Sequence, residues 1–390
     1  MKLLKYAYLT LCLLFMLAMP VSAYVDPSVV TTAVQVIAGV AVVVGTLAGV
    51  LWRRVKKALL NRIGQDGNGK KEREPDVECY DDEDDDDDED EEMPIRRYRI
   101  PISTQNNRLV NAFGHEKALE MLAQAGFDCV DMSFFCMNRD PECVFLQPGA
   151  EDLCRKLRAK AESLGLRFNQ SHAPFQMDMS RWLEGDREEI LHLLNTAIRL
   201  SGILGVRNVV VHPLHCMNYL NNDPAWIKQV NVEYYSCLVP AAKEAGVTIA
   251  IENMWQRNRY SKHIVSSVCS SPYELREYVD ACNAVEPVFT ACLDIGHCLL
   301  TGHDPANAIR VLGDRLGALH VHDVDGNNDS HTCPMTLSVD FPAVMDALWE
   351  VGYPGEFTLE ADLFYSKFPQ EKYAMALQHM AAVSKLLANP

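Results

Sequence analysis

Positive charge is scarce in this 390-residue chain, which has 36 Lys and Arg against 53 Asp and Glu and a net charge of −17. Residues 76–92 hold 14 acids and no base, and residues 1–75 hold 10 bases against 4 acids, which leaves −9 for residues 93–390. Affinity for nucleic acid comes mainly from Lys and Arg on phosphates. The charge balance therefore argues against a general nucleic-acid-binding protein.

Paired cysteines are also missing, because the 13 cysteines are an odd number and none belongs to a CxxC pair. Cys129, Cys237 and Cys292 fall inside apolar runs, where a free thiol packs as a small core side chain. We expect reduced thiols in a reducing compartment rather than a disulfide framework.

All charge is absent from residues 28–52, an apolar stretch long enough to cross a bilayer at about 1.5 Å per residue. Residues 1–23 have a basic start, an apolar stretch and a small-residue end, which is typical of a secretory signal; an uncleaved first membrane helix is the alternative. The basic cluster RRVKK at 53–57 belongs on the cytoplasmic side of a membrane. We therefore expect a cell-membrane protein with a single span after signal cleavage and a cytoplasmic C-terminal part.

The segment 53–93 changes from basic to densely acidic and has no apolar periodicity, so we expect a disordered linker. From 94 to 390, strand-like runs alternate with amphipathic helical stretches. The expected strands are 98–103, 127–133, 167–172, 208–212, 248–252, 288–294, 316–322 and 356–360. The expected helices include 151–163, 188–204, 227–245, 272–283, 306–312, 341–351 and 370–387. Strict alternation predicts a parallel sheet, and eight units predict an α/β fold of the (β/α)8 TIM barrel type.

Metal-type ligands end several of these strands. Glu252 and Glu360 end the fifth and eighth strands, Asp294 ends the sixth, and His320 lies near the end of the seventh. The carboxyl ends of barrel strands converge on one site, and burying such groups unpaired costs several kcal/mol. Carboxylates with one imidazole suit Mn²⁺ or Mg²⁺, and further histidines shift the preference toward Zn²⁺. We predict that these four residues bind a divalent metal (Mn, Mg, Co or Zn).

Other strand-end residues have two roles open. His172 and His212 would complete a second metal position beside Glu252 or donate hydrogen bonds to a substrate. His297, Asp329 and His331 would hold a third metal or contact a sugar hydroxyl or phosphate. We expect structural roles for three further histidines, as a loop residue, a helix cap and a strand-end partner: His215, His303 and His322. His322 lies on the same side of its strand as His320, so a supporting role beside the metal is open for it.

The motifs HAP, VHP, IEN, LDxGH, HVHDxDG followed by DxH, and LEAD together resemble the strand-end motifs of the xylose isomerase-like barrels. That family includes sugar-phosphate isomerases and epimerases and the endonuclease IV-type apurinic endonucleases, and the resemblance covers roughly residues 98–387. Its epimerase-like members imply metal ligands at Glu252, Asp294, His320 and Glu360. Its endonuclease-like members imply three metals and nine ligands, each with a matching residue here. The chain departs from the family at 333–338, where it reads CPMTLS in place of the frequent PGxG.

The first hypothesis is a membrane-anchored, metal-dependent isomerase or epimerase of a sugar or sugar phosphate. The metal would stabilise an enediolate, while Glu252 and Glu360 would act as base and acid on opposite faces of the sugar. Arg257 would orient hydroxyls or a phosphate, and Trp255 would either stack on a sugar face or pack in a lid.

The second hypothesis is phosphodiester hydrolysis by two or three zinc ions. Its ligand set is complete, but the acidic barrel, the membrane anchor and the lack of a basic, aromatic-rich loop argue against a DNA substrate. A third hypothesis is a catalytically silent, membrane-tethered barrel that acts as a sensor or scaffold. The identity of the sugar and metal, and whether the chain forms a homo-oligomer, stay open.

Overall fold

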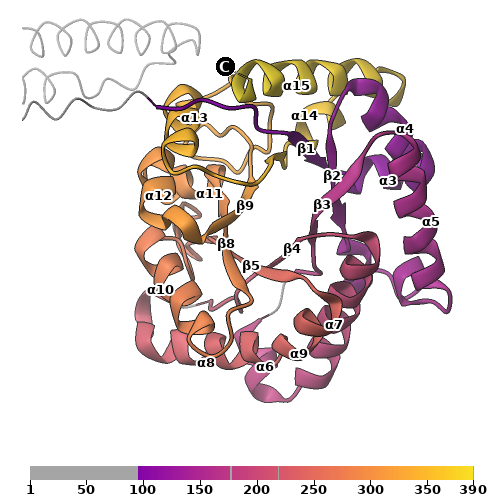
Figure 1. Ribbon diagram of the computed structural model, residues 1–390. Helices are drawn as coiled ribbons and strands as arrows, with labels where there is room; N and C mark the ends of the chain where they lie inside the picture. Colours follow the sequence, from indigo (N-terminus) through magenta and orange to yellow (C-terminus); the bar gives the residue numbers. More distant parts are fainter. Residues whose placement is uncertain (1–94, 176–177, 218, 390) are drawn as a thin grey trace, which may run out of the picture. The chain divides into compact units, whose positions relative to one another are not determined.

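The computed structural model describes residues 95–175, 178–217 and 219–389 (Figure 1). The expected signal segment at 1–23, the membrane helix at 28–52 and the linker at 53–93 all lie outside these residues. Within the described ranges, no helix is both long and apolar enough to span a bilayer.

Eight parallel strands form a barrel in the order β10-β1-β2-β3-β4-β5-β8-β9 (Figure 1). Their bounds are β1 Ile102–Gln105, β2 Cys129–Ser133, β3 Arg167–His172, β4 Asn208–Val211, β5 Thr248–Glu252, β8 Phe289–Asp294, β9 Leu316–His320 and β10 Phe357–Leu359. The two edge strands meet where Val321 pairs with Leu359, and Val321 N donates to Thr358 O at 2.8 Å. The predicted (β/α)8 barrel is confirmed.

Helices surround the ring of strands (Figure 1). The longer ones are α3 Asn107–Phe113, α4 His115–Ala125, α5 Ala150–Ser163, α7 Arg187–Leu204, α8 Pro224–Ser236, α9 Val239–Ala245, α10 Pro272–Asn283, α12 Pro305–Leu312, α13 Phe341–Glu350 and α15 Tyr373–Ala388. Short elements follow the carboxyl ends of strands: α6 Met179–Glu184, α11 Ile295–Leu300, α14 Asp362–Ser366 and the hairpin of β6 Trp255–Arg257 with β7 Ile264–Ser266.

Proline explains two of the differences in extent between expected and observed elements. The expected helix 227–245 is divided into α8 and α9, because Pro240 lacks the N–H that would bond to the Ser236 carbonyl. The first strand begins at Ile102 rather than at 98, directly after Pro101, which has no N–H to add to the sheet.

Small apolar side chains fill one layer of the barrel interior: Val210, Ala250, Cys292 and Ala318 form a buried cluster. Side chains two positions apart on a strand share a face. Two residues beyond each member of this layer, the chain carries His212, Glu252, Asp294 and His320. The apolar layer therefore lies directly beneath these polar side chains in the barrel interior.

The expectation of reduced thiols throughout is wrong for one pair, because Cys136 and Cys143 form a disulfide. The 3-10 turn Phe135–Asn138 and the turn after it reverse the chain, which brings two cysteines seven positions apart together. Nine further cysteines in the described ranges are free. Cys129 and Cys292 are fully buried among them, as expected, and Cys237 is partly buried.

Candidate metal centre and its cavity

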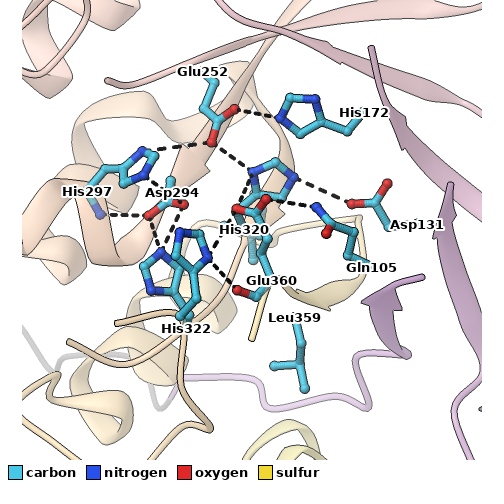
Figure 2. Close-up of polar contacts among 12 residues, drawn as sticks. Gln105, Asp131, His172, Glu252, Asp294, His297, His320, His322, Leu359 and Glu360 are labelled. Atoms are coloured by element: carbon cyan, nitrogen blue, oxygen red, sulfur yellow. Dashed lines mark hydrogen bonds and ion pairs between the residues drawn. The ribbon is translucent and has the colours of Figure 1, made fainter. Parts of the chain in front are cut away.

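The four ligands predicted for one metal lie together at the carboxyl ends of the strands (Figure 2). Nδ1 of His320 is 2.8 Å from Oε1 of Glu252 and 3.5 Å from Oε2 of Glu360. One donor atom each from Glu252, Asp294, His320 and Glu360 fits within 4.8 Å of the others. All four side chains are buried.

A second donor group combines His172 and His212 with Glu252, as the sequence suggested. Nε2 of His212 is 2.8 Å from Oε2 of Glu252, and Nε2 of His172 is 3.5 Å from the same oxygen. The two imidazole nitrogens are 3.1 Å apart. Glu252 therefore directs one oxygen toward each donor group and joins them.

A third donor group consists of His297, His322, Asp329 and His331. Nε2 of His331 is 3.0 Å from Oδ2 of Asp329, and Nε2 of His297 is 3.8 Å from the same oxygen. His322, for which a structural role at the strand end was expected, is fully buried, and its Nε2 lies 3.0 Å from Oδ1 of Asp294. Its position two residues after His320 on one face was the signal that placed it near the site.

The LDIGH segment is shaped around His322. Asp294 caps α11 by accepting the His297 N–H at 2.7 Å, which turns His297 toward the other donors. A Cβ at Gly296 would overlap the imidazole of His322. Glycine at this position therefore gives His322 the room to reach Asp294.

Opposite charges stabilise the carboxylates of the site. Burial by itself raises the pKa of Glu252, but His320 and His212 outweigh burial and hold that pKa well below its usual range. Burial likewise opposes charge on Asp294, and His297 lowers the pKa of this carboxyl nonetheless. Both acids are therefore charged and able to act as ligands.

The imidazoles respond in the opposite direction. Burial lowers the pKa of His320, but Cys292 and Glu360 are among the groups that raise it well above its usual range. Burial also opposes charge on His297, and the carboxylate of Asp294 is the main group that raises the pKa of His297 to about 10. Protons on these nitrogens occupy the place that a metal ion would take, since metal binding displaces protons from its ligands.

These residues fit a divalent metal. The donor set combines hard carboxylate oxygens with imidazole nitrogens, the mixture that Mn²⁺, Co²⁺ and Zn²⁺ accept. Oδ1 of Asp329 is buried and has no hydrogen-bond partner among the described residues, a costly state that an ion would relieve. Overlapping groups, including one of His172, His320 and Glu360, offer positions for more than one ion.

Supporting residues that the sequence did not reveal hold two of the donors. Asp131 on β2 is fully buried, accepts a hydrogen bond from Gln170 Nε2 at 3.1 Å, and places Oδ2 3.5 Å from Nε2 of His320 (Figure 2). Gln105 at the end of β1 donates Nε2 to Oε1 of Glu360 at 2.8 Å. Asp131 lies inside its strand rather than at the end, so a search for strand-end ligands misses it.

The loop that carries Asp329 and His331 is built on Asp323. This buried carboxylate accepts hydrogen bonds from the backbone N–H groups of Val324, Thr336, Leu337, Ser338 and Val339, at 2.7–3.0 Å. The CPMTLS segment thus folds around an acid of the HVHD motif. The departure from the family pattern does not keep the DxH residues from the site.

A cavity of about 510 Å³ opens above the donors, a size that suits a small-molecule ligand. Its lining includes donors of all three groups together with aromatic and cationic side chains: His172, His212, Glu252, His297, Asp329, His331, Glu360, Phe135, Phe175, Trp255, Arg108 and Arg139. Trp255 thus lies where a substrate contact was expected. Arg257 is not part of the lining; its guanidinium lies 5.3 Å from the centre of the Trp255 ring and donates to the Lys262 carbonyl.

Residues 119–383 match the profile of a family described as the xylose isomerase-like TIM barrel. A protein from Methanocaldococcus jannaschii is 28% identical over 193 residues, which are 48% of this chain and 62% of that relative, less than two thirds of its length.

Among solved structures, the 3-keto-D-glucoside 4-epimerase YcjR from E. coli has a TM-score of 0.56 at 17% identity and covers 73% of this chain and 100% of its own. A D-psicose 3-epimerase from Clostridium cellulolyticum H10 has a TM-score of 0.57 at 15% identity and covers 75% of this chain and 100% of its own. At these identities the likeness shows the barrel fold.

Proposed function

Because the chain belongs to the xylose isomerase-like TIM barrel family, we propose that it is a divalent-metal-dependent isomerase or epimerase of a sugar. The observation that carries the proposal is the group of Glu252, Asp294, His320 and Glu360 beneath a cavity large enough for a sugar. The 3-keto-D-glucoside 4-epimerase and the D-psicose 3-epimerase, which have the same fold, support this choice.

A divalent metal polarises a carbonyl and its neighbouring hydroxyl, which makes the adjoining C–H more acidic. Glu252 and Glu360 both line the cavity, so both are placed to contact a sugar. We assign them proton transfer: one carboxylate takes the proton from carbon, and the other returns a proton to the opposite face. Gln105 holds Oε1 of Glu360 and leaves Oε2 for this role. Placement within hydrogen-bond reach compensates for the weak basicity of a carboxylate.

The extra donors favour a second candidate, phosphodiester hydrolysis by several metal ions. His172 with His212, and His297 with Asp329 and His331, supply more ligands than a one-metal proton transfer needs. Two-metal and three-metal sites activate water and stabilise the leaving oxygen of a phosphoester.

Metal content and hydrogen exchange separate the two candidates. We expect about one Mn, Mg or Co per chain by elemental analysis, and exchange of a sugar C–H with heavy water. Glu252→Gln and Glu360→Gln should each abolish exchange and leave the circular dichroism spectrum unchanged. Glu350→Gln, in an exposed ion pair with Arg310, is the matched control and should retain exchange. Near-normal exchange in either site variant removes that residue from catalysis, and two or three zinc ions with phosphodiester cleavage supports the second candidate.

We further propose, from the sequence, that residues 28–52 anchor the protein in the cell membrane and that the barrel is cytoplasmic. A reporter fused after Pro390 should then give a cytoplasmic signal. An external signal would overturn the proposed topology.

A further inference from the structure

We propose that the cavity selects sugars bearing an anionic oxygen group, and that Arg139 binds this group. The inference rests on the proposed sugar function and narrows its substrate class. Arg139 follows β2 and lines the cavity. Its guanidinium carbon lies 4.5 Å from the centre of the Phe175 ring and 5.9 Å from that of Phe135. The centre of the Phe135 ring lies in turn 4.7 Å from that of His172, one of the metal donors. The Phe135 ring therefore connects Arg139 to the donor groups.

The segment that carries Arg139 is held on several sides. The disulfide between Cys136 and Cys143 encloses it, and the Arg139 N–H donates to the Cys136 carbonyl at 3.0 Å. The neighbouring Asn138 side chain donates to the backbone carbonyl of Phe175. The guanidinium packs against two aromatic rings, and the backbone of its segment is held by hydrogen bonds. Little conformational entropy is therefore lost when Arg139 binds an anion.

Arg139 differs from the other arginine of the lining in having its charge available. Arg108 donates Nε to Oδ2 of Asp362 at 2.9 Å, so its charge is already compensated. Arg139 has no carboxylate partner within the described residues. Its planar fork matches the oxygens of a phosphate or a carboxylate.

The location of Arg139 also indicates which end of the sugar carries the anionic group. A metal ion held by the donor groups would attract the carbonyl and hydroxyl oxygens of the reacting end, and the carboxylates of these groups would repel a free anion wherever no metal shields them. Arg139 lies beyond the aromatic rings from these donors. The geometry therefore places the anionic group at the end of the sugar remote from the reacting carbons.

The test compares three ketoses that differ only at C6: D-fructose, D-fructose 6-phosphate and D-fructuronate. Their dissociation constants are measured by calorimetry with the full-length chain loaded with Mn²⁺. Arg139→Met retains the apolar packing on Phe175 and removes the donors. Arg257→Met is the matched control, because Arg257 also stacks on an aromatic ring but lies outside the cavity lining.

We expect one charged ketose to bind the unmodified protein at least about 10-fold more tightly than D-fructose, as charge-assisted hydrogen bonds imply. Arg139→Met should abolish this preference, so that the charged ketose and D-fructose bind alike, while Arg257→Met should preserve it. The preferred ketose identifies the group as phosphate or carboxylate. No preference in the unmodified protein, a preference that survives Arg139→Met, or an equal loss in both variants would each overturn the assignment.

The failure of this inference is distinguishable from the failure of the proposed function. Binding selectivity lost in Arg139→Met, without C–H exchange in heavy water, would keep the anion site and reject the isomerase or epimerase. Exchange of neutral sugars with no charge preference would reject the anion site and keep the enzyme.

Discussion

The substitution Asp131→Asn should weaken metal binding without unfolding the barrel. Oδ2 of Asp131 faces both Gln170 Nε2 and His320 Nε2, two nitrogens that carry hydrogen. An acceptor at Nε2 holds the proton there and leaves Nδ1, which faces Glu252 and Glu360, free to bind a metal. Asparagine has the same shape, but both nitrogens face the same atom, so its neutral amide presents to them either an uncharged acceptor oxygen or an NH₂ group. His320 would then lose the charged partner that sets its tautomer.

The expected magnitude follows from the 3.5 Å between Nε2 of His320 and Oδ2 of Asp131. Two unit charges at this distance interact by about 5 kcal/mol at an effective dielectric constant of about 20. A metal-bound imidazole is neutral and presents only an N–H dipole, so the loss should be smaller. Partners of metal-bound histidines typically contribute about 10- to 100-fold to metal affinity, or about 1.4–2.7 kcal/mol.

Competition with a fluorescent chelator measures this loss directly as the dissociation constant for Mn²⁺ or Zn²⁺. Asn169→Ala is the matched control. Asn169 is buried on the neighbouring strand β3 and bonds to Ser103 and Thr358, so its loss should reduce stability without changing metal affinity. If folded Asp131→Asn protein binds the metal within about twofold of the unmodified protein, Asp131 does not orient His320.

Three further predictions concern the surroundings of the donors. Gly296→Ala should displace His322 from the ligand Asp294 and weaken metal binding; an unchanged dissociation constant for Mn²⁺ would contradict the packing argument. Asp323→Ala should lower the free energy of unfolding by at least about 3 kcal/mol in urea, because buried N–H groups lose a charged acceptor, and a loss below about 1 kcal/mol would refute this. The raised pKa of His297, about 10 against about 6.5 in an unfolded chain, stabilises the metal-free fold fully below pH 6.5 and progressively less as the pH rises toward 10. The melting temperature in EDTA should therefore fall over this range, and a flat profile there would argue against a protonated His297.

The sequence alone was enough to predict the barrel and the end of the barrel at which its acids and histidines gather. Alternation of β-branched runs with amphipathic stretches indicates which segments form strands and which form helices, since both periods are local properties of the chain. Glu252, Asp294, His320 and Glu360 were found because parallel strands bring their carboxyl ends together in any barrel, whatever the details of packing. The same reasoning placed His172, His212, His297, Asp329 and His331 at the same end.

Tertiary structure decided what depends on distances between segments far apart in the sequence. The contact of Asp131 with His320 spans the barrel interior, and the disulfide of Cys136 with Cys143 depends on how one loop turns. Arg139, rather than Arg257, lines the cavity because the β6–β7 hairpin turns Arg257 toward the Lys262 carbonyl. Strand periodicity specifies a side chain's face but not its neighbour across the barrel, and loops have no period at all. The sequence thus determined the fold and the metal-type donors, and the packing of loops and interior determined their partners.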